Sequence, residues 1–276
     1  MSTYTLTSLN TTQIPEFQAW TDVHGMAQID SNGSTSDNGN LFTAHYTFGL
    51  VAKNIITSQE KARILLVYRN NFMQTGLLTR FPGDRRTEAQ DDIFGLMGAE
   101  ALLFPNPKDR LMTKQIYEYG RTANCHGLDP LSDPSLVTIN KWLYWPLKII
   151  GLGTLKWVWN TRSPNKFDSS EWLGRFGNLV ATMQMSQRKI VNPFLWVWWA
   201  IAMLLPYYRP NPSDLDSYAL NIHSANACQG YGWLTNWVCG KVRATLKRDH
   251  GDMAGMMNAY LNNVPNPYST LLSGVI

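Results

Sequence analysis

The chain has 276 residues, of which 44% are hydrophobic and only 16% are charged, so a disordered protein is excluded and a large buried core is within reach. The formal net charge of +4 is too small to indicate a nucleic-acid partner. The three cysteines and five histidines show no metal-ligand spacing, and no phosphate-binding or dinucleotide-binding motif occurs, so the sequence predicts no metal site and no cofactor.

The first forty residues are polar and rich in Ser, Thr, Asn and Gly, with one short turn of structure expected at residues 14–20. This region has neither a basic start nor an apolar run, so we expect no signal peptide and a cytoplasmic or virion-associated location. We divide the chain into a polar N-terminal segment, residues 1–40, and a single helical domain, residues 41–276.

Apolar residues at a period near 3.6 predict helices over residues 41–54, 58–74, 87–104 and 111–120. Asp37 or Asn40 is expected to cap the first of these helices, Ser58 the second and Thr87 the third. A polar loop with a Pro82–Gly83 turn separates the second helix from the third.

The second half of the chain also shows a helical pattern. Helices are predicted over residues 138–159 in two pieces, then over 171–185, 193–208, 215–229, 233–247 and 252–261, followed by an extended tail. The basic run at 241–250 is interpreted as a solvated helix face. Because alternating strand patterns and hairpin signals are missing, the predicted fold is an all-α multi-helix array of about ten helices.

The segment 193–208 is the most apolar part of the chain. A 16-residue helix is about 24 Å long, whereas the hydrocarbon core of a bilayer is about 30 Å thick, and Pro206 interrupts the segment. We therefore predict no stable membrane span and interpret the segment as a helix buried on all sides. The alternative is an interfacial segment flanked by Lys189 and Arg209.

The candidate site residues lie in the polar stretch between residues 37 and 92, where loops lead into helices. Carboxylates near arginines are typical of general acid–base chemistry on a polar substrate. The predicted catalytic residues are Asp37, Asp91 and Asp92, and the predicted substrate-binding residues are His45, Tyr46, Arg80 and Arg85.

Two interpretations of the acids remain open. Asp91 and Asp92 stand above the small residues Gly95 and Gly98 on one helix, which could leave open volume for a ligand. Alternatively, the acids favour the start of the helix and the small residues allow close helix packing. His223 is interpreted as an isolated structural histidine.

Tandem helices, acids at helix starts and a high content of aromatic residues (11 Trp, 12 Tyr and 10 Phe) resemble the (α/α) toroids, which include glycoside hydrolases and polysaccharide lyases. The segments DNGNLFTAHY and RFPG…DD resemble uncharacterised helical proteins of tailed phages. The first resemblance implies a carbohydrate-active enzyme with a polysaccharide substrate, and the second a phage origin. The alternative is a non-catalytic helical protein of a phage virion or assembly, with a virion or homo-oligomer partner.

Overall fold

The computed structural model describes residues 14–22, 24–28, 38–70, 78–79, 90–122, 178–179, 181–183, 185–187, 193–204, 215–260 and 267–275. Across these ranges the named elements are all helices, which confirms the predicted all-α class. They are η1 (Pro15–Trp20), α2 (Gly39–Ala52), α3 (Ser58–Asn70), α4 (Gln90–Leu103), η2 (Pro107–Asp109), α5 (Leu111–Thr122), α10 (Pro193–Leu204), α11 (Leu215–Cys228), α12 (Trp233–His250), α13 (Met253–Tyr260) and α14 (Pro267–Leu272).

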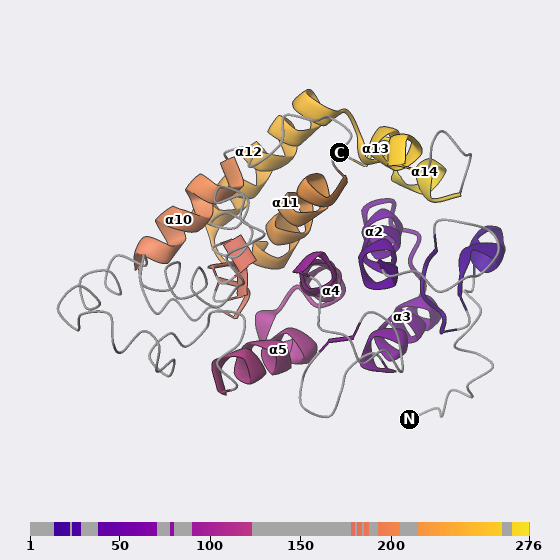
Figure 1. The fold of residues 1–276 in the computed structure, drawn as a ribbon, viewed down its shortest axis with the longest axis horizontal. Helices are drawn as coiled ribbons and strands as arrows, with labels where there is room; N and C mark the ends of the chain where they lie inside the picture. Colours follow the sequence, from indigo (N-terminus) through magenta and orange to yellow (C-terminus); the bar gives the residue numbers. More distant parts are fainter. Residues whose placement is uncertain are drawn as a thin grey trace, which may run out of the picture.

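Helix α4 lies at the centre of the described fold, between α2 and α11 (Figure 1). A methyl group added at Gly95 would lie 3.2 Å from both Ala44 Cβ and Leu41 Cα on α2. A methyl group added at Gly98 would lie 2.7 Å from His223 Nδ1 on α11. The two glycines therefore let two helices approach α4 closely, and the space beside them is filled by those helices.

Helix α2 is buried along almost its whole length even though it contains polar residues. Thr43 Oγ1 donates to the carbonyl oxygen of Gly39 at 2.7 Å, and Thr47 Oγ1 donates to that of Thr43 at 2.8 Å. Thr43 Oγ1 also accepts a hydrogen bond from Ala27 N at 3.0 Å. Because each hydroxyl is satisfied within the chain, these side chains can be buried without loss of hydrogen bonding.

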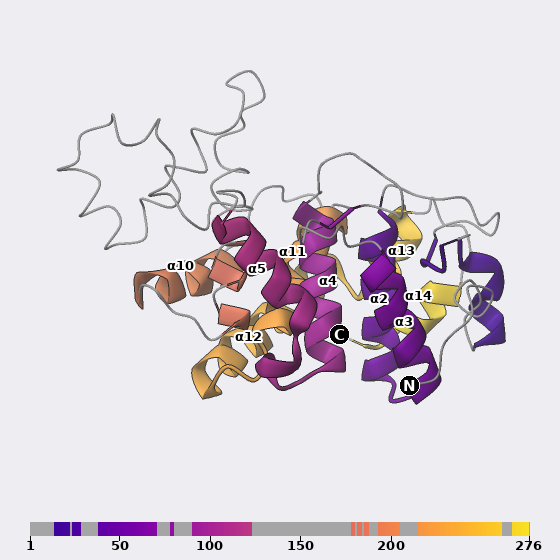
Figure 2. The same cartoon turned by 90° about the horizontal axis from the view of Figure 1, so that it is seen from below.

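The C-terminal helix α14 closes one side of the core by packing on α2 and η1 (Figures 1 and 2). The ring of Tyr268 stacks on Phe17 with centroids 5.3 Å apart, and Tyr268 Oη donates to the carbonyl oxygen of Trp20 at 2.7 Å. The expectation of an extended tail is wrong here. Tyr268, Leu271 and Leu272 have helical spacing and are buried, a pattern that is difficult to recognise in a helix of six residues that begins at a proline.

The helix starts differ in detail from the predicted ones. Glu60 N donates to Thr57 Oγ1 at 3.0 Å, so Thr57, rather than Ser58, supplies the side-chain cap of α3. The residue before α2 is Asn38, whose side chain makes no capping bond. Asn40 lies within the helix. Thr87, and the helices predicted over residues 138–159, lie outside the described residues.

Among the described side chains of α10, those on one side are buried and those on the other side are exposed, which corrects the prediction of burial on all sides. Trp199 is completely buried, and Trp196 is partly buried against the core. Val197 and Ile201 are 46% and 45% exposed on the other side. Within the described ranges, no helix has the length and apolar character needed to cross a membrane.

The close packing of α4 gives a prediction with a matched control. Gly98→Ala should lower the free energy of unfolding by about 1–3 kcal/mol, because the new methyl group displaces His223. Gly240→Ala, in the interior of α12 where an added methyl group meets nothing within 4 Å, should raise it by about 0.5–1 kcal/mol. Urea unfolding measures both changes, and equal effects of the two substitutions would contradict the packing described for α4.

Candidate functional site

Helices α2 and α4 begin at the same end of the fold, and polar groups gather there. Asn40 Nδ2 donates to the carbonyl oxygen of Thr79 at 2.7 Å, and Tyr68 Oη donates to the carbonyl oxygen of Asn40 at 2.9 Å. Burial raises the pKa of Tyr68, and the nearby charge of Asp92 raises it further. We call Asn40, Tyr68, Thr79 and Asp92 the helix-start cluster.

Two of the predicted catalytic carboxylates lie at this end of the fold. Asp91 and Asp92 both occupy the first turn of α4, where the partial positive charge of the helix end stabilises a carboxylate. Asp92 is buried, whereas Asp91 is partly exposed. Three other residues predicted for the site, Asp37, Arg80 and Arg85, lie outside the described residues.

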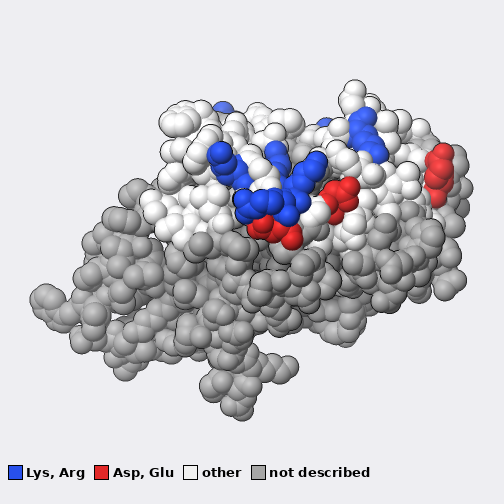
Figure 3. Space-filling view, turned by 90° about the horizontal axis from the view of Figure 1, so that it is seen from above, with Lys and Arg blue, Asp and Glu red and all other residues white. Residues whose placement is uncertain are grey.

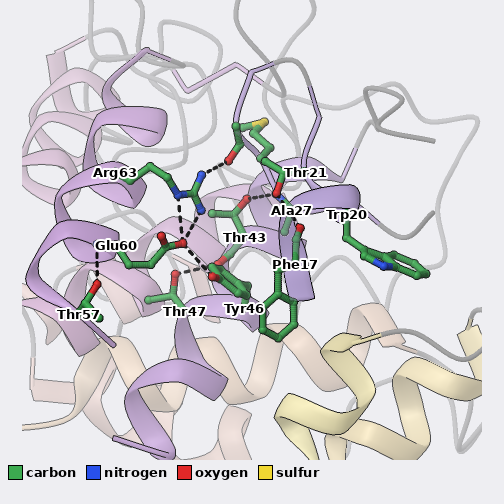
Figure 4. A network of polar contacts seen from close by, with 12 residues as sticks. Phe17, Trp20, Thr21, Ala27, Thr43, Tyr46, Thr47, Thr57, Glu60 and Arg63 are labelled. Carbon is green, nitrogen blue, oxygen red and sulfur yellow. Dashed lines mark hydrogen bonds and ion pairs between the residues drawn. The ribbon is translucent and has the colours of Figure 1, made fainter. Parts of the chain in front are cut away.

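The structure does not bring His45 and Tyr46 together. Their side chains diverge because consecutive residues on a helix point about 100° apart. The ring of His45 lies against that of His223 on α11, with centroids 4.9 Å apart. Tyr46 Oη instead donates to Glu60 Oε1 on α3 at 2.8 Å (Figure 4). The interpretation of His223 as isolated is therefore wrong, because its partner comes from a distant part of the sequence.

Glu60 belongs to a buried ion pair that links three parts of the chain. Arg63 donates two hydrogen bonds to Glu60 Oε1, from Nε at 3.0 Å and from Nη2 at 2.8 Å (Figure 4). Its third nitrogen, Nη1, donates to the carbonyl oxygen of Gly25 at 2.6 Å. Both charged side chains are almost completely buried. With Tyr46 as the third partner, the network joins α2, α3 and the turn that follows η1, so its arrangement serves the fold.

Two further charged residues that the sequence analysis did not select also hold the fold together. Glu100 accepts hydrogen bonds from Met112 N at 2.8 Å and Thr113 N at 2.7 Å, so it caps α5, and burial raises its pKa. Arg110 donates to the carbonyl oxygens of Phe104 at 2.9 Å and Ala227 at 2.6 Å. Their partners are backbone groups brought together by the fold, so no local sequence pattern identifies these roles.

His45 and His223 form a buried pair between α2 and α11. Burial lowers the pKa of His45 to about 3, and burial together with the neighbouring His45 lowers the pKa of His223. The ring nitrogens of both residues are buried, and none of the described residues is a hydrogen-bond partner for them. Both rings are therefore neutral near neutral pH, and charging either one in place would be unfavourable.

Among the residues that the structure describes, no group of three or more His, Cys, Asp or Glu side chains is arranged to hold a metal ion. No protein-family model matches the chain, and neither a curated protein nor a solved structure matches it.

The histidine pair predicts how stability depends on pH. Both folded-state pKa values lie below the unfolded value of 6.5, so the unfolded chain binds protons first as the pH falls. The free energy of unfolding should therefore fall by about 2 kcal/mol through His45 from about pH 7 to about pH 5, and His223 should add a loss in the same direction. Urea unfolding across this range provides the measurement, and His45→Phe should remove the contribution of His45.

The control is Ile222→Val, a buried substitution on α11 without a titrating group, which should cost about 1 kcal/mol at every pH. The raised pKa values of Asp22 and Glu100 act in the opposite direction, because the folded protein then binds protons first. Both acids are present in all variants, so the difference between variants isolates the histidines. A pH dependence that is the same in His45→Phe and the wild type would contradict the account of the pair.

Proposed function

We propose that this protein is a non-catalytic helical interaction protein that docks one exposed face against a partner in a larger assembly. The observation that carries the proposal is the exposure of two tryptophans on α12, Trp233 at 80% and Trp237 at 54%. Tryptophan is enriched at binding surfaces because it offers a large apolar area together with a polar N–H group. A chain of this size can bury large apolar side chains in its core. Because these two tryptophans are exposed, we infer that they contact a partner.

The roles of three buried acids support the same proposal. Glu60 pairs with Arg63, Glu100 caps α5, and Asp22 accepts hydrogen bonds from His24 N at 2.8 Å and Met26 N at 2.9 Å. In each case the partners of the carboxylate belong to the chain itself. These contacts stabilise helix ends and turns, and they do not require a substrate.

A second candidate function is a carbohydrate-active enzyme, a glycoside hydrolase or polysaccharide lyase built as an (α/α) toroid. The observation that favours it is the position of Asp91 and Asp92 in the first turn of α4, at the end of the fold where α2 also begins. In this proposal Asp37 completes the set of carboxylates, and Arg80 and Arg85 bind acidic groups of the polysaccharide. Such chemistry needs one carboxyl group that donates a proton and another that stays ionised.

The interaction proposal is tested by gradient sedimentation of native extracts that contain the protein together with its natural partners. Wild-type chain should sediment in a complex, and the Trp233→Gln/Trp237→Gln double variant should shift to the position of free protein. Ile55→Gln is the matched control, since Ile55 is 48% exposed and lies in the connection from α2 to α3. Figure 1 shows these two helices on the other side of the fold from α10 and α12. Co-migration of the double variant with wild type would contradict the proposal.

A screen of the purified chain against polysaccharides separates the two candidates. The enzyme proposal expects release of reducing ends or unsaturated sugars, with Asp91→Asn abolishing cleavage and leaving the melting temperature nearly unchanged. The interaction proposal expects no release by the wild type. It also expects Asp92→Asn to lower the free energy of unfolding by about 1 kcal/mol, because the negative charge at the helix start is lost.

A further inference from the structure

Helix α12 has a buried side and an exposed side. The buried side packs against the core through Thr235, Val238, Cys239, Val242 and Leu246. The exposed side carries Trp233, Trp237, Lys241, Ala244, Lys247 and Arg248. Because a helix turns once in 3.6 residues, these exposed positions form one continuous strip along the helix. We call this strip the α12 face.

The α12 face is aromatic near the start of the helix and basic near its end. Lys241 Nζ lies 5.7 Å from the centre of the Trp237 ring, so a cation and an aromatic ring meet in the middle of the face. Lys247 and Arg248 follow one to two turns later, and Arg248 forms an exposed ion pair with Asp249 at 2.8 Å. Figure 3, which looks onto the side of the molecule where α12 runs, shows lysine and arginine side chains gathered there with acidic side chains beside them.

Helix α10 packs against α12 and also exposes apolar side chains. Val197, Ile201 and Leu204 are 46%, 45% and 37% exposed, and their spacing of four and three residues places them on one side of the helix. Trp199 and Met203 are buried on the opposite side. Two helices in contact therefore both present apolar side chains to solvent, which marks an interaction surface.

We propose that the α12 face binds the surface of an anionic lipid bilayer. Trp233 and Trp237 would enter the headgroup region, where the apolar ring and the polar N–H group are both accommodated. Lys241, Lys247 and Arg248 would contact lipid phosphates. This inference rests on the proposed function, because it names the partner of the same face.

The charges on the face favour a bilayer over a second copy of the chain. A symmetric contact would bring Lys241, Lys247 and Arg248 of both copies into one interface, and this concentration of positive charge is unfavourable. A nucleic-acid duplex would attract the cations, but its charged backbone offers no apolar boundary for Trp233 and Trp237. An anionic bilayer offers phosphates for the basic end of the face and an apolar boundary for its aromatic end.

Co-sedimentation with vesicles tests the inference. The full chain is mixed with vesicles of equimolar phosphatidylcholine and phosphatidylglycerol, or with vesicles of phosphatidylcholine alone. We expect the chain to sediment with the anionic vesicles and to remain in solution with the neutral ones. Added salt should weaken the binding, because it screens the attraction between the cations and the lipid phosphates.

Surface variants identify the side chains that bind. Trp233→Gln/Trp237→Gln should lower the partition coefficient about tenfold or more, since two large apolar side chains are lost from the contact. Lys241→Gln and Lys247→Gln should each lower it about fivefold. Ile55→Gln should leave it unchanged, and all of these variants should keep the wild-type melting temperature because the replaced side chains are exposed.

Three results would overturn the lipid inference: equal binding to both kinds of vesicle, binding that the tryptophan substitutions do not change, and binding to a DNA duplex without binding to vesicles. If the chain does not bind vesicles but the double variant still shifts in the gradient of native extracts, the lipid inference is wrong and the proposed function stands. Failure of both experiments removes both proposals.

Discussion

The close approach of α2 and α11 to α4 is the constraint on which the rest of the described fold depends. Gly95 and Gly98 provide the space for it, because a side chain at Gly98 would collide with His223 on α11 and one at Gly95 would crowd α2. The result is a central helix buried on nearly every side, with Asp91 and Asp92 confined to its first turn. The same approach brings His223 against His45 and keeps both rings away from water.

The sequence predicted the described helices well wherever polar breaks or Pro and Gly mark the ends of a segment. The bounds of α3, α5, α11, α12 and α13 lie within a few residues of the expected ones, because each of these segments is delimited by polar breaks or by Pro and Gly. The short helix α14 was missed, since its stability comes from packing on α2 and η1 and not from its own six residues. The exposed side of α10 was missed because composition alone cannot show which apolar side chains find a partner.

The candidate site was harder to predict than the fold. Neighbours in sequence are not neighbours in space on a helix, so His45 and Tyr46 serve two different contacts, one with His223 and one with Glu60. The small residues Gly95 and Gly98 permitted two interpretations, open volume for a ligand or close packing of helices. In the structure, α2 and α11 occupy the space beside them. The basic run in α12 was correctly interpreted as solvated at Lys241, Lys247 and Arg248, but its meaning depends on the tryptophans that share that face.

The central claim is that the α12 face is the binding surface of the molecule. Spin labels on this face test the claim most directly. Labels are placed singly at positions 233, 237, 244 and 55, and their collisions with a water-soluble paramagnetic reagent are measured with and without anionic vesicles. The account predicts that vesicles shield the labels at 233, 237 and 244 and leave the label at 55 accessible. Unchanged accessibility at all four positions, or equal shielding at position 55, would contradict it.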